Sequence, residues 1–203
     1  MFETREQAGE LLAEKLLACG HPGVVVLGIP RGGVPVAKII ANRLEAPLGL
    51  VVTKKISAPG HEELAIGAVG PKGEAVLDDE LIERLGITGK ELQKQIQKSK
   101  VKIRKYKSKF KSEVDLKKKA VILVDDGVAT GATVEVAIKH LRGKKVGQIV
   151  LALPVGPKDT IKRLNRLVDK IVVLETPPDF LAVGQFYRDF PQITDEEVIE
   201  LLQ

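Results

Sequence analysis

Two adjacent carboxylates stand directly before a loop of small residues in this chain. Asp125 and Asp126 follow an apolar run, 121–124, of the kind that forms a buried strand, and a helical pattern begins after the loop. At the end of a strand, the two acids can accept hydrogen bonds from neighbouring ribose hydroxyls. The backbone N–H groups and threonine hydroxyls of 129–133 can bind a phosphate at the positive end of the helix. The spacing therefore predicts a site for a ribose 5-phosphate.

A second loop offers groups that suit a pyrophosphate. Pro30, Arg31, Gly32 and Gly33 follow another apolar run, 24–29. The arginine can make forked contacts with phosphate oxygens, and the glycines let the backbone approach a ligand closely. A simple strand-to-helix turn is the alternative interpretation of this loop.

Other interpretations of the two loops have less support. No Gly-x-x-x-x-Gly-Lys-Ser/Thr sequence occurs, and the glycines between 28 and 33 do not fit Gly-x-Gly-x-x-Gly. An ordinary surface turn with helix-capping threonines is the alternative for 125–133. Adjacent acids at a buried strand end argue against it, because they repel each other unless a cation, a donor or a diol accompanies them.

The run from Val121 to Thr133 closely resembles the phosphoribosyl pyrophosphate (PRPP) signature of type I phosphoribosyltransferases, and 24–37 resembles their first strand and pyrophosphate loop. The resemblance extends from about residue 3 to the C-terminus, and in particular to a bacterial and archaeal subgroup with an unsettled acceptor. It implies that the acids bind the ribose 2- and 3-hydroxyls and that the loop binds the 5-phosphate. The PRPP-binding residues would be Asp125, Asp126, Gly127, Val128, Ala129, Thr130, Gly131, Ala132 and Thr133. The pyrophosphate-binding residues would be Pro30, Arg31, Gly32 and Gly33.

The resemblance also implies a reaction and a cofactor. A nitrogenous base or related acceptor would displace pyrophosphate from the ribose of PRPP, with Mg²⁺ carried mainly by substrate oxygens and water, near Asp125 and Asp126. No dedicated metal site is expected, and a strained, often cis, peptide is implied at Pro30–Arg31. Position 129 is Ala, where 6-oxopurine enzymes carry an acid, so an adenine-like, orotate-like or unconventional acceptor is favoured.

Candidate catalytic groups follow the second apolar run. Lys54 and Lys55 stand where a basic group could reach a leaving pyrophosphate, together with Arg31, although paired lysines at the start of a loop are commonplace. Glu62 belongs to the same predicted polar loop, 54–65, which could close over substrate as a lid. The adjacent histidine is more simply interpreted as a solvated loop residue.

Three aromatic residues gather in the segment after the last predicted strand. Phe180, Phe186 and Tyr187 stand beside two prolines and a glycine, which indicates an ordered cover. By resemblance this segment, about 175–190, is the hood that grips the acceptor base. Packing as plain core is the alternative for each aromatic side chain.

The rest of the pattern alternates between helices and strands. Helices are expected at 5–18, 34–44, 79–86, 89–112, 133–142, 158–167 and from Thr194, and strands at 24–29, 48–53, 65–69, 74–77, 120–124, 147–153 and 170–174. This alternation predicts an α/β fold in three layers, a parallel sheet with helices on both faces. We expect one domain over 1–203, with a core of about 20–175 and a helical insertion of about 79–115.

Composition is that of a modest enzyme. The chain has 203 residues, 44% of them hydrophobic, and no apolar stretch approaches the about 18 residues of a membrane span. Its first residues are charged, unlike a signal peptide, and Cys19 is the single cysteine, so a cytoplasmic protein without disulfides is expected.

One stretch of the chain is strongly basic. Residues 90–119 contain 13 Lys or Arg and three acids. Its apolar residues follow one helical stripe, and Thr88 with Glu91 predicts a capping box, so a long helix with solvated lysines is the simplest interpretation. Contact with nucleic acid is less favoured, because no aromatic residues for base stacking lie outside the apolar stripe. Contact with a phosphate-bearing substrate is a further alternative.

The leading functional hypothesis is an enzyme, a phosphoribosyltransferase whose partners are PRPP and an unidentified base or amine. The competing hypothesis is a regulator that senses PRPP and binds RNA, DNA or protein without catalysis. The candidate catalytic groups favour the enzyme, because a sensor does not need them. Hydrolysis of a ribose phosphate, or ligand sensing within a multi-enzyme assembly, is a weaker possibility. A homodimer is implied only by analogy with type I relatives.

Overall fold

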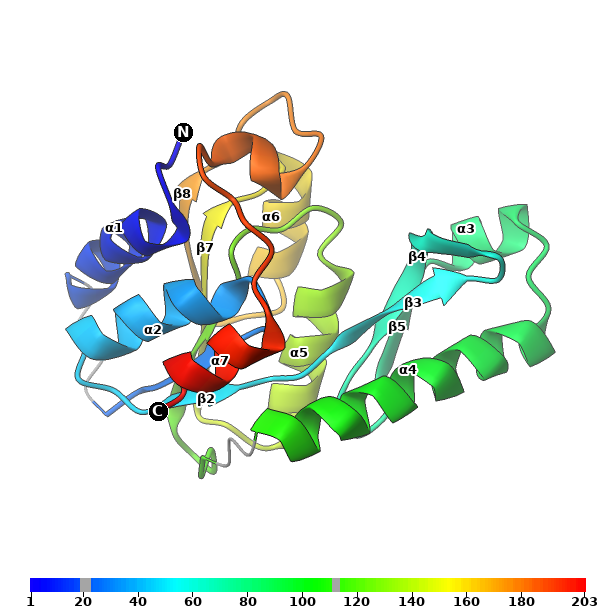
Figure 1. The fold of residues 1–203 in the computed structure, drawn as a ribbon, viewed down its shortest axis with the longest axis horizontal. Helices are drawn as coiled ribbons and strands as arrows, with labels where there is room; N and C mark the ends of the chain where they lie inside the picture. The colour runs from blue at the N-terminus through cyan, green and yellow to red at the C-terminus, as the bar shows by residue number, and fades with distance from the viewer. Residues whose placement is uncertain (19–22, 111–113) are drawn as a thin grey trace.

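The structure, a computed structural model, describes residues 1–18, 23–110 and 114–203 (Figure 1). Cys19 and the last two positions of the helix expected over 89–112 lie outside these ranges. Within the described ranges, none of the helices combines the length and the apolar character that crossing a membrane requires.

Five parallel strands form the central sheet. They are β1 (Val25–Gly28), β2 (Leu48–Leu50), β6 (Ala120–Val124), β7 (Gln148–Val155) and β8 (Lys170–Glu175). Their order in the sheet is β2-β1-β6-β7-β8, and every neighbouring pair is parallel. The strands are apolar at successive positions because helices cover both faces of the sheet.

Alternate residues of each strand face two different helix layers. α1 (Arg5–Leu17) and α2 (Gly33–Arg43) cover one face, onto which Val26 and Ile122 pack. α5 (Ala132–Gly143) and α6 (Lys158–Asn165) cover the other face, with Leu27 and Leu123 beneath them (Figure 1). This three-layer arrangement confirms the α/β class predicted from the sequence.

The order of the strands reverses direction between β1 and β6. From β1 the chain passes through α2 to β2 on one side, whereas β6 pairs with the other side of β1 and continues through α5 to β7. The two connecting helices lie on opposite faces of the sheet. Sheets with such a reversal bind their ligands in the crevice beyond the carboxyl ends of the strands that flank it, which are β1 and β6 in this chain.

Residues 54–65 are strands, so the polar loop predicted there is wrong. β3 (Lys54–Ala58), β4 (His61–Val69) and β5 (Ala75–Leu77) form a separate antiparallel sheet, and Gly60, with φ of 76°, makes the turn between the first two. Ile56 and Ala58 are buried at alternate positions, while the residues between them are polar. The strand pattern is hard to recognise in the sequence, because β3 has only five residues and begins with two lysines.

Two further helices complete an arm, residues 54–110, that extends to one side of the core (Figure 1). They are α3 (Asp79–Arg84) and α4 (Gly89–Phe110). α4 buries Ile96, Ile103 and Phe110 against the hairpin, and most of its lysines are exposed. Thr88 and Glu91 form the predicted capping box at its start. The predicted amphipathic helix is therefore confirmed over its described part.

The first residues of the chain pair with the segment that follows β8. After β8 come a short 3₁₀ helix, η1 (Val183–Phe186), and the last helix, α7 (Asp195–Leu201). A capping box of Thr194 and Glu197 begins α7, the helix predicted from Thr194. The N–H of Phe2 donates to the carbonyl of Phe186 at 2.7 Å, and the N–H of Arg188 donates back to the carbonyl of Phe2 at 2.8 Å. The chain entering α1 is thereby fixed to the segment that follows η1.

Candidate functional site

The two loops at the switch point of the sheet lie directly against each other. A Cβ atom added at Gly32 would collide with the carboxylate of Asp126, and a Cβ at Gly33 would come within 3.0 Å of the carboxylate of Asp125. The loop after β1 can approach the acids after β6 this closely only because its residues are glycines. The structure therefore brings together the two motifs that the sequence separates by more than 90 residues.

The two acids have different surroundings. Asp125 accepts a hydrogen bond on Oδ1 from the N–H of Asp126 at 3.0 Å, and it forms no ion pair within the described residues. Burial raises the pKa of Asp125, and the adjacent carboxylate of Asp126 raises this pKa further. Asp126 holds a cation, because its Oδ2 lies 2.8 Å from Nε of Arg5. Burial also raises the pKa of Asp126, but Arg5 opposes that rise.

In the second half of the loop after β6, backbone N–H and carbonyl groups differ in their partners. Within the described residues, none of the N–H groups of 129–133 donates a hydrogen bond. From α6, Thr160 Oγ1 donates to the carbonyl of Ala129 at 2.9 Å, and Arg163 donates to the carbonyl of Thr130 at 2.5 Å. Side chains of α6 thus bind the carbonyl groups of the loop, while its N–H groups stay available at the start of α5. This arrangement suits an anion.

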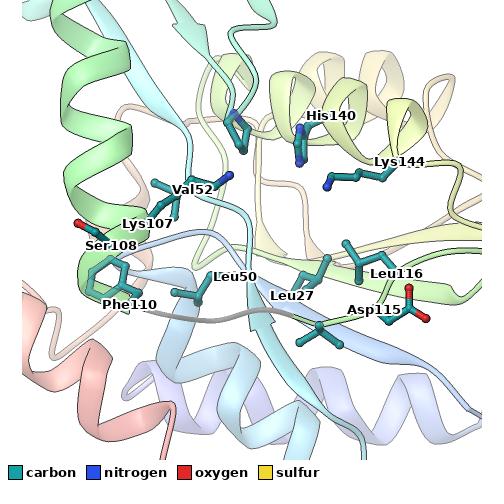
Figure 2. A pocket seen from close by; sticks show the side chains of 12 residues that line it. Leu27, Leu50, Val52, Lys107, Ser108, Phe110, Asp115, Leu116, His140 and Lys144 are labelled. Atoms are coloured by element: carbon teal, nitrogen blue, oxygen red, sulfur yellow. The ribbon is translucent and has the colours of Figure 1, made fainter.

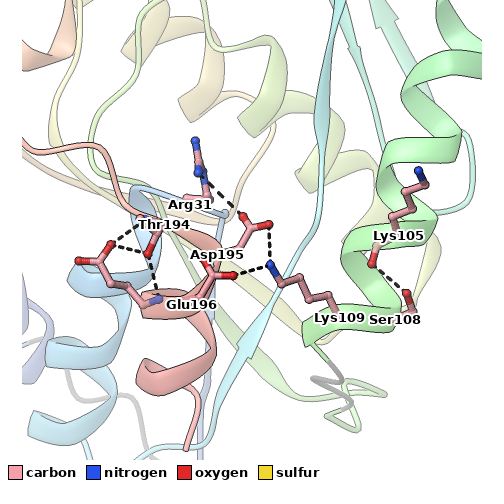
Figure 3. A network of polar contacts seen from close by, with 8 residues as sticks. Arg31, Lys105, Ser108, Lys109, Thr194, Asp195 and Glu196 are labelled. Atoms are coloured by element: carbon pink, nitrogen blue, oxygen red, sulfur yellow. Dashed lines mark hydrogen bonds and ion pairs between the residues drawn. The ribbon is translucent and has the colours of Figure 1, made fainter.

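A group of cations lies beside the loop after β1. The peptide between Pro30 and Arg31 is cis, as the resemblance implied. The Arg31 guanidinium lies 3.9 Å from Oδ1 of Asp195 at the start of α7, and Lys109 of α4 lies 3.0 Å from Oδ2 of the same acid (Figure 3). The charge of Arg31 therefore faces α7, an element that lies outside both sequence motifs.

The paired lysines at the start of β3 have different environments. Lys54 Nζ lies 3.8 Å from the ring centre of Tyr106 on α4. Burial lowers the pKa of Lys54, and the nearby charge of Arg31 lowers it further. Lys55 is exposed, and its charge acts on Asp125, where it lowers the pKa. Both lysines thus lie near the site, Lys54 beside Arg31 and Lys55 nearer the acids.

Glu62 does not lie with the other candidate groups. It is exposed at the turn end of the hairpin, whereas Lys54 lies at the opposite end and pairs with Val69. Because a strand rises about 3.3 Å per residue, the two ends are roughly 13 Å apart. The structure therefore does not place Glu62 beside the acids or the cations.

The predicted hood lies over the phosphate loop. Phe180 and Phe186 stack on each other with ring centres 5.2 Å apart, and both are half-buried. Val183 of η1 lies so close to Gly127 that a Cβ there would come within 2.5 Å of it. The hood segment and the loop after β6 therefore touch, and aromatic surface stands next to the crevice.

Tyr187 is packed behind the acids. Its side chain is buried, its hydroxyl donates to the carbonyl of Asp126 at 2.6 Å, and its ring stacks on Phe190 at 4.8 Å. Tyr187 therefore packs as plain core, whereas the half-buried Phe180 and Phe186 leave the predicted hood role open to a test.

Comparison with known proteins adds the family. The model of the phosphoribosyl transferase domain matches residues 3–191. The chain belongs to this family. Two proteins of Mycobacterium tuberculosis, each named "Putative phosphoribosyl transferase", are 38% identical over 205 residues, an alignment that covers 100% of this chain and 46% of each relative. This phosphoribosyl transferase domain thus spans about half the length of those relatives.

Solved structures agree with this assignment. The crystal structure of a protein from Thermus thermophilus, TT1426, is 39% identical, has a TM-score of 0.81, and covers 99% of this chain and 97% of that one. A purine phosphoribosyltransferase from Pyrococcus horikoshii is 20% identical with a TM-score of 0.50, covering 94% and 92%, and this likeness shows the shared fold.

Three residues of this phosphoribosyl transferase domain that touch the candidate site belong to none of the sequence motifs. They are Arg5, Tyr106 and Asp195. Tyr106 was assigned to the apolar stripe of a helix, and Asp195 only follows a capping threonine. In the sequence, Arg5 is only a charged residue within an apolar helical pattern. Such residues are too common for this pattern to predict a role in the site.

A cavity of about 1080 Å³ lies elsewhere in the domain, between α4 and α5. Leu50 and Val52 point into it from the edge of the sheet, and His140 and Lys144 point into it from α5 (Figure 2). None of the predicted site residues lines this cavity. We therefore locate the candidate site beyond the carboxyl ends of β1 and β6, where the two loops lie against each other.

Proposed function

We propose that this protein transfers a 5-phosphoribosyl group from PRPP to a nitrogenous base or related acceptor and releases pyrophosphate. One observation carries the proposal: the acids and free N–H groups after β6 adjoin the glycine loop after β1 at the switch point of the sheet. A diol acceptor, a phosphate cradle and a pyrophosphate loop in one crevice match the three parts of PRPP.

Each part of PRPP has a proposed partner. Asp125 and Asp126 accept hydrogen bonds from the ribose hydroxyls. The loop 127–133 holds the 5-phosphate through the N–H groups of 129–133 and the Thr130 and Thr133 hydroxyls. The loop from Pro30 to Gly33 holds the pyrophosphate. Family membership and the local geometry support these roles.

The proposed chemistry depends on stabilising the leaving group. Positive charge develops on the ribose as its bond to pyrophosphate weakens, as in glycoside cleavage. Arg31 and Lys54 supply cations to the departing pyrophosphate, and Lys55 adds charge near Asp125. Glu62 contributes only if the hairpin bends toward the crevice, since it lies at the far end of β3 and β4.

The residues present fit a Mg²⁺ ion that arrives with the substrate. Within the described part of the chain, no group of three or more His, Cys, Asp or Glu could hold a metal by itself. Mg²⁺ is commonly held by one or two carboxylates plus substrate phosphates and water, and Asp125 and Asp126 supply that number. When bound, the ion would neutralise pyrophosphate charge.

We propose that the acceptor meets the crevice beneath the stacked rings of Phe180 and Phe186. Their half-buried aromatic surface lies next to the phosphate loop, through the contact of Val183 with Gly127. Ala129 offers no acid to handle the proton of a 6-oxopurine, which favours other bases.

A screen for pyrophosphate release tests this function. We expect PRPP, Mg²⁺ and at least one base or small amine to yield pyrophosphate and the matching ribonucleotide. Asp125→Asn should abolish release, whereas Asp159→Asn, at an exposed acid of α6, should leave it unchanged. Saturable PRPP binding without turnover for any acceptor would contradict the enzyme and support a PRPP-sensing regulator.

A further inference from the structure

The geometry points to Arg5 as a positioning residue for the substrate site, and we propose that it fixes the Asp126 carboxylate for ribose binding. This inference rests on the proposed function and assigns part of it to a helix outside both motifs. Arg5 is the first residue of α1, and 121 positions separate it from Asp126.

The Arg5 guanidinium is engaged both along its edge and on its face. Nε donates to Oδ2 of Asp126 at 2.8 Å, and an Nη atom donates to the carbonyl of Pro191 at 2.8 Å. The face of the group lies 3.8 Å from the ring centre of Phe190. The side chain is only 6% exposed, so this charge sits in the protein and not in solvent. A guanidinium suits the place because it donates in its plane and stacks on an aromatic face at once.

The same assembly holds the backbone of Asp126. Phe190, which stacks on Arg5, also stacks on Tyr187, and the Tyr187 hydroxyl donates to the Asp126 carbonyl at 2.6 Å. The Asp126 carboxylate is therefore held by Arg5 of α1, and its carbonyl is held by Tyr187 of the hood segment.

Fixing Asp126 has a direct consequence for the crevice. Its carboxylate lies against Gly32 of the pyrophosphate loop, so a turn of this side chain would disturb that loop as well as the ribose contact. The charge of Arg5 also offsets one of two adjacent acids, which allows both carboxylates to face one diol. The N-terminal helix would thus set the geometry of a site formed by residues far along the chain.

The test compares PRPP affinity in Arg5→Gln, Arg5→Lys and a matched control, Arg43→Gln, measured by calorimetry with Mg²⁺. Arg43 is also a helical arginine with an acidic partner, Glu10 at 3.4 Å, but it is 48% exposed and lies away from the crevice. We expect Arg5→Gln to weaken PRPP binding by about 10- to 100-fold, as supporting partners of ligand-binding groups do. Arg5→Lys should recover only part of the loss, and Arg43→Gln should match the parent protein.

A double-mutant cycle separates positioning from a general effect on the fold. If Arg5 acts through Asp126, Arg5→Gln should add little to the loss caused by Asp126→Asn. Additive losses, or unchanged affinity in Arg5→Gln, would overturn the inference. If Arg5→Gln does not fold, Arg5→Lys decides, and parental affinity there would overturn it. A parent protein that does not bind PRPP would refute the proposed function itself and the inference with it.

Discussion

At Asp125, the fold holds a charge under unfavourable conditions. Burial raises its pKa, and the neighbouring Asp126 raises it further, while Arg5 pairs with Asp126 alone. A carboxyl whose folded pKa lies above its unfolded value of 3.8 gives the folded state an advantage at low pH. That advantage is lost as the pH rises through the folded pKa. A carboxyl group accepts hydrogen bonds from ribose hydroxyls best in its ionised form. Binding of PRPP therefore favours the charged form of Asp125, whereas the stability of the fold favours the neutral form.

Replacement of Asp125 by Asn should therefore stabilise the free protein at neutral pH. Asn keeps an oxygen for the N–H of Asp126 but carries no charge to bury. We expect Tm to rise at pH 7, by about 2–4 °C for each kcal/mol gained in the free energy of unfolding, and to match the parent below pH 3.8. Thermal unfolding from pH 3 to 8, without PRPP or Mg²⁺, measures the difference. A lower Tm at pH 7 would show that the charge stabilises the fold.

Individual site residues could be predicted where they stand in runs. Asp125, Arg31 and the loop 127–133 were found because a strand ends beside them in the sequence. Arg5 could not be found in this way, since its partners stand at 126 and beyond 186. The spacing of residues within one segment gives no information about a contact between segments that lie so far apart in the sequence.

At the scale of elements, the helices were more predictable than the first strands of the arm. The caps at Thr88 and Thr194 and the stripe of α4 follow from short-range rules, and the structure confirms them. The strands at 54–65 were missed because polar residues occupy their outward positions. The connection between α7 and the loop after β1, through Asp195, depends on how separate elements pack and has no local signal.

The position of α7 leads to a prediction about pyrophosphate. Oδ1 of Asp195 is buried, has no hydrogen-bond partner within the described residues, and lies 3.9 Å from Arg31. Burial acts to raise the pKa of Asp195, but Lys109, Tyr106 and Arg31 together outweigh it. The pKa therefore falls below its usual value, and the group is charged at neutral pH. A negative charge here competes with pyrophosphate for Arg31.

Asp195→Asn should therefore bind pyrophosphate more tightly. Partly exposed pairs are worth up to about 1 kcal/mol, so we expect a gain in affinity of about 2- to 5-fold. Calorimetry with pyrophosphate and Mg²⁺ measures it, with Asp159→Asn as the control at an exposed acid. Weaker binding would mean that Asp195 orients Arg31 for the ligand instead of competing with it.

At the scale of the whole molecule, alternation of helices and strands predicted the layered sheet, and the order of its strands explains where the site lies. The sequence could not supply that order, because pairing between β1 and β6 joins segments about 95 residues apart. We propose that the whole chain acts as one unit, with the helical insertion of 79–115 and the hood of 175–190 added to the core. The insertion carries 11 of the 32 Lys and Arg residues of the chain, and Lys109 and Tyr106 connect it to the site.

Titration of the protein with PRPP and Mg²⁺ in a calorimeter tests the central claim most directly. The account predicts saturable binding by the parent protein. It predicts no measurable binding by Asp125→Asn or by the double variant Asp125→Asn with Asp126→Asn, while circular dichroism shows that both keep the fold. Undiminished affinity in these variants, or no binding by the parent protein, would contradict the claim that the paired acids and the loop behind them hold PRPP.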